Sequence, residues 1–256
     1  MREATYNNKV LKLYGTDPRE LPLYGIREAS RYLKVHENTL RSWIFGRRYR
    51  LESGEERFAQ PVIQLPDSKV SMLSFTNLVE LYVLSAITRV HKIRFPKVRI
   101  ALNFLEAIFQ RPHPLATHQF WTDQFDLFVK ESGDLICASR DGQLVMQQVL
   151  EQYLLRIDRD IDRSAMRIYP FAREMTFRSS VEHPDSILRN APKHISIDPL
   201  VGFGRPTIAG TGIATNVIAG RFRAGDKIKV IAKDYDLEEK KVQEAIEYEG
   251  VEYWAA

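Results

Sequence analysis

The chain has 256 residues, 44% of them hydrophobic and 27% charged, which is the composition of a globular protein with one to three domains. No apolar run approaches the roughly 18 residues that a transmembrane helix needs, and the N-terminus lacks the hydrophobic core of a signal peptide. One cysteine, Cys137, excludes an internal disulfide framework, so we expect a cytoplasmic protein with no membrane association.

The formal net charge of +4 is concentrated near the N-terminus. Between Tyr24 and Arg50, seven basic side chains stand against two acidic ones, so this segment carries +5 and the rest of the chain −1. A basic patch on a nearly neutral body is typical of a protein that binds a polyanion. A solvated helix face is the alternative interpretation of the same charges.

Residues 26–44 show the apolar pattern of a helix-turn-helix. Two groups of apolar side chains at helical spacing flank a short turn: Ile26, Ala29 and Leu33, then Leu40, Trp43 and Ile44. The second helix of such a motif lies in the major groove of DNA. We expect Asn38, Thr39 and Arg41 to read bases there, because Asn and Arg can make paired hydrogen bonds to adenine and guanine edges.

The residues that follow predict a wing and two apolar helices. Two β-rich runs surround Ser53-Gly54, a hairpin signal, and this hairpin would place three arginines on phosphates: Arg47, Arg48 and Arg50. The helices are expected over residues 74–90 and 95–110, the first capped by Ser74 or Thr76 and the second opened by Pro96. This order of elements, from Leu23 to Gln110, resembles the DNA-binding domain of MerR-like regulators. The alternative is a helix-turn-helix that serves only packing.

The middle of the chain reads as a small α+β unit. We expect a linker over residues 113–121, a β-hairpin around residues 131–134, an amphipathic helix over residues 142–157 and a strand over residues 165–172. Three aspartates, at 158, 160 and 162, alternate as in a calcium loop. The glycine and the closing glutamate of such a loop are replaced by Arg163 and Tyr169, so a salt-bridged helix end is expected instead.

We find no catalytic or metal-binding constellation in the sequence. His113 and His118 lie in a Pro-containing stretch with no neighbouring cysteine, which argues against zinc. No serine stands in a nucleophile elbow. We therefore expect no metal, no cofactor and no enzyme activity.

The most glycine-dense stretch, GFGRPTIAGTG at residues 202–212, fails the phosphate-binding templates. It contains no lysine for a Walker loop, and Thr207 stands where the dinucleotide fingerprint needs a third glycine. We expect its glycines to permit turns with positive φ between short extended pieces. Three short helices should follow, over residues 216–225, 226–235 and 236–249.

The segment from residue 195 to residue 249 closely resembles a domain family of unknown function found in VapB-type antitoxins. The shared motifs are Asp198-Pro199, Gly204 to Pro206, Gly210-Thr211, Ala224-Gly225 and residues 232–248. One departure is Gly212, which stands before Ile213 where the family has an arginine. The whole chain resembles the larger VapB antitoxins that pair with PIN-domain ribonucleases.

This resemblance implies the antitoxin of a type II toxin–antitoxin pair. Such a protein forms a homodimer, inhibits a PIN-domain ribonuclease toxin within a hetero-oligomer, and represses its own operon by binding double-stranded promoter DNA. The alternative is a stand-alone MerR-like transcription regulator that senses a ligand. We expect a mainly α fold with small β elements (α+β): a winged helix-turn-helix over residues 1–111, a hairpin–helix unit over residues 112–192 and a three-helix domain over residues 193–256.

Charge separates the two helix-turn-helix patterns of the chain. From Ser196 to Glu249 eight basic residues stand against nine acidic ones, so a DNA duplex would repel this segment. We therefore assign DNA reading to the N-terminal motif, and dimerisation or toxin docking to the C-terminal domain. Its short strands are expected to pair across a two-fold axis. The expected toxin-facing residues are Arg221, Arg223, Tyr253 and Trp254, because guanidinium groups can pair with metal-binding carboxylates and aromatic rings anchor interfaces.

Overall fold

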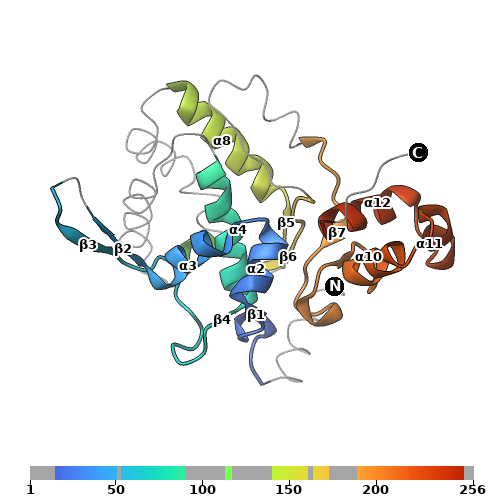
Figure 1. The fold of residues 1–256 in the computed structure, drawn as a ribbon, viewed down its shortest axis with the longest axis horizontal. Coiled ribbons are helices and arrows are strands. Elements are labelled where there is room, and N and C mark those ends of the chain that lie inside the picture. The colour runs from blue at the N-terminus through green and yellow to red at the C-terminus, as the bar shows by residue number, and fades with distance from the viewer. Residues whose placement is uncertain are drawn as a thin grey trace.

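Figure 1 shows the protein as a computed structural model, which describes residues 15–50, 53–89, 113–116, 140–160, 164–172 and 189–250. Within these ranges the chain forms seven α-helices and four two-stranded antiparallel sheets. The predicted class, α+β with an N-terminal helix-turn-helix, is confirmed. None of the described helices is long and apolar enough to cross a membrane.

The N-terminal unit is a helix-turn-helix followed by a β-hairpin and a long helix. Its elements are η1 (Pro18–Glu20), β1 (Tyr24–Gly25), α2 (Ile26–Leu33), α3 (Glu37–Phe45), β2 (Arg47–Arg50), β3 (Glu56–Ala59), β4 (Met72–Leu73) and α4 (Phe75–Arg89). The six apolar side chains that define the motif in the sequence are all buried. β1 pairs with β4, and β2 pairs with β3 to form the predicted wing. Ser74 caps α4, since its hydroxyl accepts a hydrogen bond from the backbone N–H of Asn77 at 3.1 Å.

Helix α4 is the centre of the first core. Every side chain from Leu78 to Leu84 is buried, as expected for a helix that is apolar around most of its circumference. α8 (Arg140–Leu154) packs against it, and the ring centroids of Tyr82 and Tyr153 lie 4.8 Å apart. η2 (Pro114–Ala116) also packs on α4. The described part of the middle segment therefore shares one core with the helix-turn-helix.

The aspartate-rich run begins in a β-hairpin formed by β5 (Ile157–Arg159) and β6 (Ala165–Ile168). The predicted helix end is wrong, because Ile157 pairs with Ile168 and both side chains enter the core. Asp158 instead faces Arg167, whose Nη1 lies 3.6 Å from its Oδ2. Nη2 of the same arginine lies 2.9 Å from Oδ2 of Asp198, which ties this hairpin to the C-terminal segment.

The C-terminal domain has a core of its own. Its elements are β7 (Ile195–Ser196), η3 (Gly202–Gly204), β8 (Thr207–Ile208), α10 (Thr215–Arg223), α11 (Ile228–Asp234) and α12 (Glu239–Tyr248). β7 pairs with β8, and β-bridges join Ile197 to Ile168 and Ala214 to Thr207. These strands pair with each other within the chain, and the expected pairing across a two-fold axis stays a prediction.

The glycine-rich stretch forms the predicted turns. Gly202, Phe203 and Gly204 are all left-handed, with φ of 58°, 57° and 75°, and the Phe203 side chain is 91% exposed. Gly204 packs against the N-terminal unit: a Cβ atom there would lie 2.3 Å from the hydroxyl of Tyr24, a side chain that is only 2% exposed. This glycine therefore provides both a left-handed backbone conformation and a close approach between the C-terminal domain and the N-terminal unit.

Several predicted features lie outside the described residues. They are the helix opened by Pro96, the hairpin around residues 131–134, Cys137, His118, Asp162 and the tail residues Tyr253 and Trp254. The domain boundaries at residues 111 and 192 stay predictions.

Gly204→Ala should destabilise the protein more than Gly210→Ala. Both glycines have positive φ, 75° and 81°, but a Cβ at Gly210 meets nothing within 4 Å. The strain of left-handed backbone costs about 1 kcal/mol at either site, and the clash with buried Tyr24 adds about 1–3 kcal/mol at Gly204 alone. Urea unfolding of both variants measures the difference. Equal losses of stability would show that Tyr24 moves aside at no cost.

Candidate nucleic-acid interface

The outward face of α3 carries the residues predicted to read DNA. Asn38 and Arg41 are exposed and Thr39 is half-buried, while Leu40 on the opposite side is fully buried. His36 caps the helix, since its Nδ1 accepts a hydrogen bond from the backbone N–H of Asn38 at 3.2 Å. An imidazole here does the work of the hydroxyl or carboxylate that usually caps a recognition helix.

Arg41 is paired with Glu37 one helical turn earlier. Its Nε and Nη2 both lie 2.9 Å from Oε1 of Glu37, and the two side chains are 52% and 35% exposed. Exposed pairs of this spacing are weak. Arg41 can therefore exchange the carboxylate for a guanine edge, but Glu37 places a negative charge beside the reading face.

The wing presents its arginines on both faces. Arg47, Arg48 and Arg50 are all exposed on β2, and alternation along the strand puts the last two on one face and Arg47 on the other. Arg50 lies 3.8 Å from Glu56 on β3, in a pair whose side chains are 71% and 63% exposed. All three guanidinium groups are therefore within reach of solvent and of a polyanion.

Arg57 is a basic residue of this surface that the sequence analysis missed. It stands opposite Tyr49 in the register of β2 and β3, so it shares a face of the hairpin with Arg47. Its Nε donates to Oε1 of Glu55 at 3.2 Å, again as an exposed pair. The hairpin register would have revealed it, because pairing Arg50 with Glu56 places Arg57 beside Tyr49.

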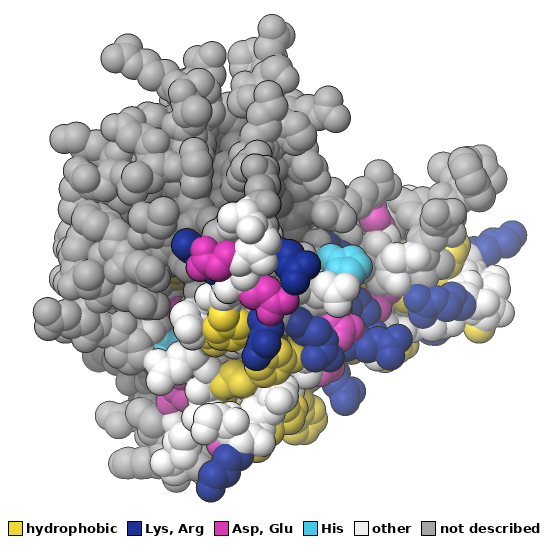
Figure 2. Space-filling view, turned by 60° about the vertical axis from the view of Figure 1, so that its left-hand side comes forward, with side chains coloured by type: hydrophobic (Ala, Val, Ile, Leu, Met, Phe, Trp, Pro, Cys, Tyr) yellow, Lys and Arg dark blue, Asp and Glu magenta, His cyan; other side chains and the backbone are white. Residues whose placement is uncertain are grey.

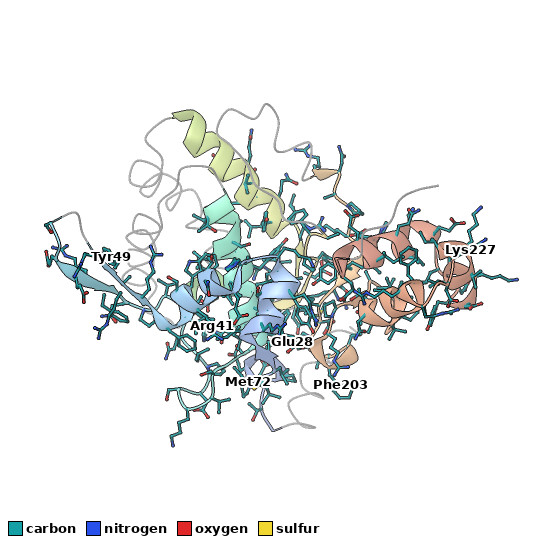
Figure 3. The ribbon with its side chains drawn as sticks, viewed as in Figure 1. Glu28, Arg41, Tyr49, Met72, Phe203 and Lys227 are labelled. Carbon is teal, nitrogen blue, oxygen red and sulfur yellow. The ribbon has the colours of Figure 1, made fainter. Side chains whose placement is uncertain are left out.

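Exposed aromatic side chains accompany the arginines. Phe45 at the end of α3 is 40% exposed, and Phe58, opposite Arg48 on the wing, is 49% exposed. Figure 2 shows this side of the molecule, where dark blue Lys and Arg side chains lie beside a yellow hydrophobic patch with a few carboxylates between them. Figure 3 places Arg41 on α3 and Tyr49 on the wing. The surface is basic and partly apolar.

The two arginines predicted to face a toxin differ in their surroundings. Arg221 is held by two carboxylates, with Nε 2.6 Å from Asp226 and Nη2 2.8 Å from Asp234. These hydrogen bonds raise the pKa of Arg221 further above its ordinary value. Arg223 is exposed, and its Nη2 donates to the carbonyl of Glu249 at 3.3 Å. Arg223 is the more available of the two.

The charges of the C-terminal domain are divided between its helices. Lys227, Lys229 and Lys233 are exposed on and beside α11, and none of them forms an ion pair with another described residue. Figure 3 places Lys227 at the far tip of this domain. The exposed start of α12 carries Glu238 and Glu239 next to two lysines, and Glu238 lies 2.8 Å from Lys240 and 3.6 Å from Lys241. The start of α12 therefore has no excess of positive charge, whereas α3 and the wing carry several exposed arginines, which favours assigning DNA reading to α3.

His113 belongs to a structural pair. Its Nδ1 lies 2.8 Å from Oε2 of Glu80 on α4. Burial raises the pKa of Glu80, and contact with this carboxylate raises the pKa of His113 despite its own burial. In the described part of the chain, no group of three or more His, Cys, Asp or Glu side chains could hold a metal ion.

Comparison with known proteins identifies two domains in this chain. Residues 22–102 match the family model described as "Putative DNA-binding HTH domain", and residues 195–248 match "Protein of unknown function (DUF433)". The first match contains α3 and the wing. The fold and these matches define the class: an α+β protein whose N-terminal helix-turn-helix is similar to a putative DNA-binding domain and whose C-terminal domain is similar to DUF433.

A curated relative and a solved crystal structure, both from Mycobacterium tuberculosis, are similar to the chain over most of its length. "Putative antitoxin VapB45" is 28% identical over 243 residues, which cover 89% of this chain and 94% of that protein. The crystal structure of Rv2018 aligns with a TM-score of 0.57 at 24% identity, over 88% of this chain and 98% of that one. The structural likeness shows that the two chains share a fold.

Proposed function

We propose that this chain is the antitoxin of a type II toxin–antitoxin pair. It represses its own operon by binding promoter DNA, and it inhibits a PIN-domain ribonuclease by direct contact. The observation that carries the proposal is the surface formed by α3 and the arginine-rich wing, in a chain whose similarity to "Putative antitoxin VapB45" extends over 89% of its length. The regulatory role needs no catalytic centre.

In this proposal α3 enters the major groove and the wing follows the backbone. Asn38, Thr39 and Arg41 face the base edges, and Arg47, Arg48 and Arg50 neutralise phosphates. Arg57 is added to the phosphate contacts because it shares a face of the hairpin with Arg47. The exposure of these arginines supports such contacts.

Arg41→Ala and Arg48→Ala should weaken DNA binding in different ways. The first removes a base contact, so it should cost about 1–3 kcal/mol on the promoter and relax base preference. The second removes a phosphate contact, so it should weaken binding to every sequence and lower the slope of log affinity against log salt by about one unit. Fluorescence anisotropy with promoter and scrambled duplexes at several salt concentrations measures both. Unchanged promoter affinity in both variants contradicts the assignment.

Glu37→Gln should increase the affinity for DNA of any sequence. The substitution removes a negative charge next to Arg41 while keeping the shape of the side chain, so binding at low salt should tighten about threefold and the gain should fade as salt rises. Glu238→Gln removes the same charge from the exposed start of α12 and is the matched control. If both variants tighten binding equally, net charge rather than position is responsible.

The C-terminal domain is the proposed toxin-docking unit. Arg223 and the lysines around α11 offer exposed cations to the carboxylates of a PIN-domain active site. Val217 on α10 and Val230 on α11 add apolar side chains that are 46% and 45% exposed. Arg221 is also a proposed toxin contact, although its guanidinium group must leave Asp226 and Asp234 before it can pair with a toxin carboxylate. Tyr253 and Trp254 in the tail complete the set.

A toxin-neutralisation assay in cells tests the docking unit. Arg223→Ala and truncation after Glu249 should each lower the rescue of growth, because they remove an exposed cation and two aromatic anchors. Arg221→Ala should also disturb the junction of α10 with α11, so circular dichroism must accompany it. If every variant rescues growth as well as the parent chain, the toxin docks elsewhere.

The pairing itself is tested by co-purification with the product of the adjacent gene. A stable complex in which the partner's ribonuclease activity is suppressed supports the antitoxin role. Light scattering then gives the state of the free chain, for which a homodimer is proposed, and of the hetero-oligomer. A chain that binds its promoter but no neighbouring gene product would instead be a stand-alone regulator.

A further inference from the structure

The ends of two helices from different parts of the chain meet beside the DNA-reading motif. α2 ends at Leu33, where the turn of the helix-turn-helix begins, and α12 ends at Tyr248 in the C-terminal domain. The hydroxyl of Tyr248 donates to the backbone carbonyl of Tyr32 at 2.9 Å, and Nζ of Lys34 donates to the backbone carbonyl of Tyr248. Each helix end thus supplies a donor to a terminal carbonyl of the other.

Reciprocal capping of this kind stabilises the meeting of two helix C-termini. The last carbonyls of a helix lack partners within the helix and form the negative end of its dipole, so two such ends repel unless donors or a cation lie between them. Lys34 provides that cation, and its Nζ also lies 4.3 Å from the centre of the Tyr248 ring. Tyr248 and Tyr32 are only 1% and 3% exposed, so water cannot replace the lost bond.

The contact acts on the turn that orients the recognition helix. Lys34 is left-handed, with φ of 55°, and its own N–H bonds to the carbonyl of Ser30. The Ser30 hydroxyl donates to the carbonyl of Val35 at 2.6 Å, and α3 begins two residues later. These hydrogen bonds leave the backbone of the turn few free torsions. A contact that fixes Lys34 therefore also fixes the direction in which α3 leaves the turn.

The C-terminal end of α12 is itself fixed within its domain. The hydroxyl of Thr215, the first residue of α10, lies 2.5 Å from Oε1 of Glu249. Arg223 at the other end of α10 reaches the carbonyl of the same residue. The partner that Lys34 finds is therefore an ordered helix end. In Figure 1 the C-terminal helices lie on the side of α2 that is turned away from the wing.

We infer that Lys34 and Tyr248 are positioning residues for DNA reading: by capping each other's helix they hold the helix-turn-helix in the orientation in which α3 fits the major groove. This inference rests on the proposed function, in which α3 reads promoter DNA. The C-terminal domain then contributes to promoter affinity without touching DNA, because only the docked orientation binds well.

Tyr248→Phe in the full-length chain is the first test. It removes one buried hydroxyl and no charge, at a site that DNA does not reach. Promoter affinity should fall about three- to tenfold, the factor that one hydrogen bond represents, with an unchanged salt slope. Ile231→Val, in the fully buried core of the same domain, is the matched control for stability and should leave the affinity of the folded protein unchanged.

Lys34→Gln is the second test, for the case in which Tyr248→Phe does not fold. Lys229→Gln removes the same charge from an exposed site on α11 and controls for net charge. If Lys34 is a positioning residue, Lys34→Gln should bind the promoter more weakly, and its slope of log affinity against log salt should equal that of the Lys229→Gln control. A slope lower by about one unit would mean that Lys34 contacts a phosphate directly, which overturns the inference.

Three outcomes keep this inference separate from the proposed function. If the parent chain does not prefer its promoter to a scrambled duplex, the proposed function fails. If the parent prefers its promoter and Tyr248→Phe binds as tightly as the parent, the inference alone fails. If Tyr248→Phe and Ile231→Val lose affinity equally, and in proportion to their loss of stability, the contact is only structural and the inference also fails.

Discussion

The burial of α4 is the constraint on which the rest of this structure depends. The middle of this helix is apolar on nearly every side, so α2, α8 and η2 must cover it from different directions. The polar groups that enter the core with it find partners: Nδ2 of Asn77 donates to the carbonyl of Gln64 at 2.8 Å, and Glu80 meets His113. The helix-turn-helix is therefore mounted on this core through the packing of α2 against α4.

Two arginines attach the C-terminal domain, and the residues that lead into it, to this core. Arg156 is 2% exposed, and its guanidinium donates to the carbonyls of Tyr169, Ala191 and Pro192 at 2.7, 2.9 and 2.6 Å. Arg167 bonds to Asp198 at the start of the DUF433 domain. A buried guanidinium needs several acceptors in fixed places, so it is a specific joint between segments. The meeting of α12 with the turn after α2 follows from this placement.

Much of the candidate interface could be predicted from the sequence, because it depends on local periodicity. Helical spacing alone puts Leu40 inside and Asn38 and Arg41 outside, and the arginine run after Gly46 falls on a strand. The role of Arg57 could not be assigned, since it depends on the register of two strands across a turn. The different partners of Arg221 and Arg223 also depend on tertiary contacts. Their positions on α10 do not show which carboxylates come within reach of each guanidinium group.

By itself the sequence determined the helix-turn-helix, the wing, the turns at the glycine-rich stretch and the three C-terminal helices. Each of these follows from the spacing of apolar side chains or from the need for positive φ over a few residues. Only the tertiary structure decided that the aspartate-rich run enters a hairpin, that β7 and β8 pair within one chain, and that the middle segment shares the core of α4. It also decided that Tyr248 caps α2, a contact between residues 216 positions apart. No local pattern encodes such a contact, because it arises when the chain folds and brings two unsatisfied helix ends together.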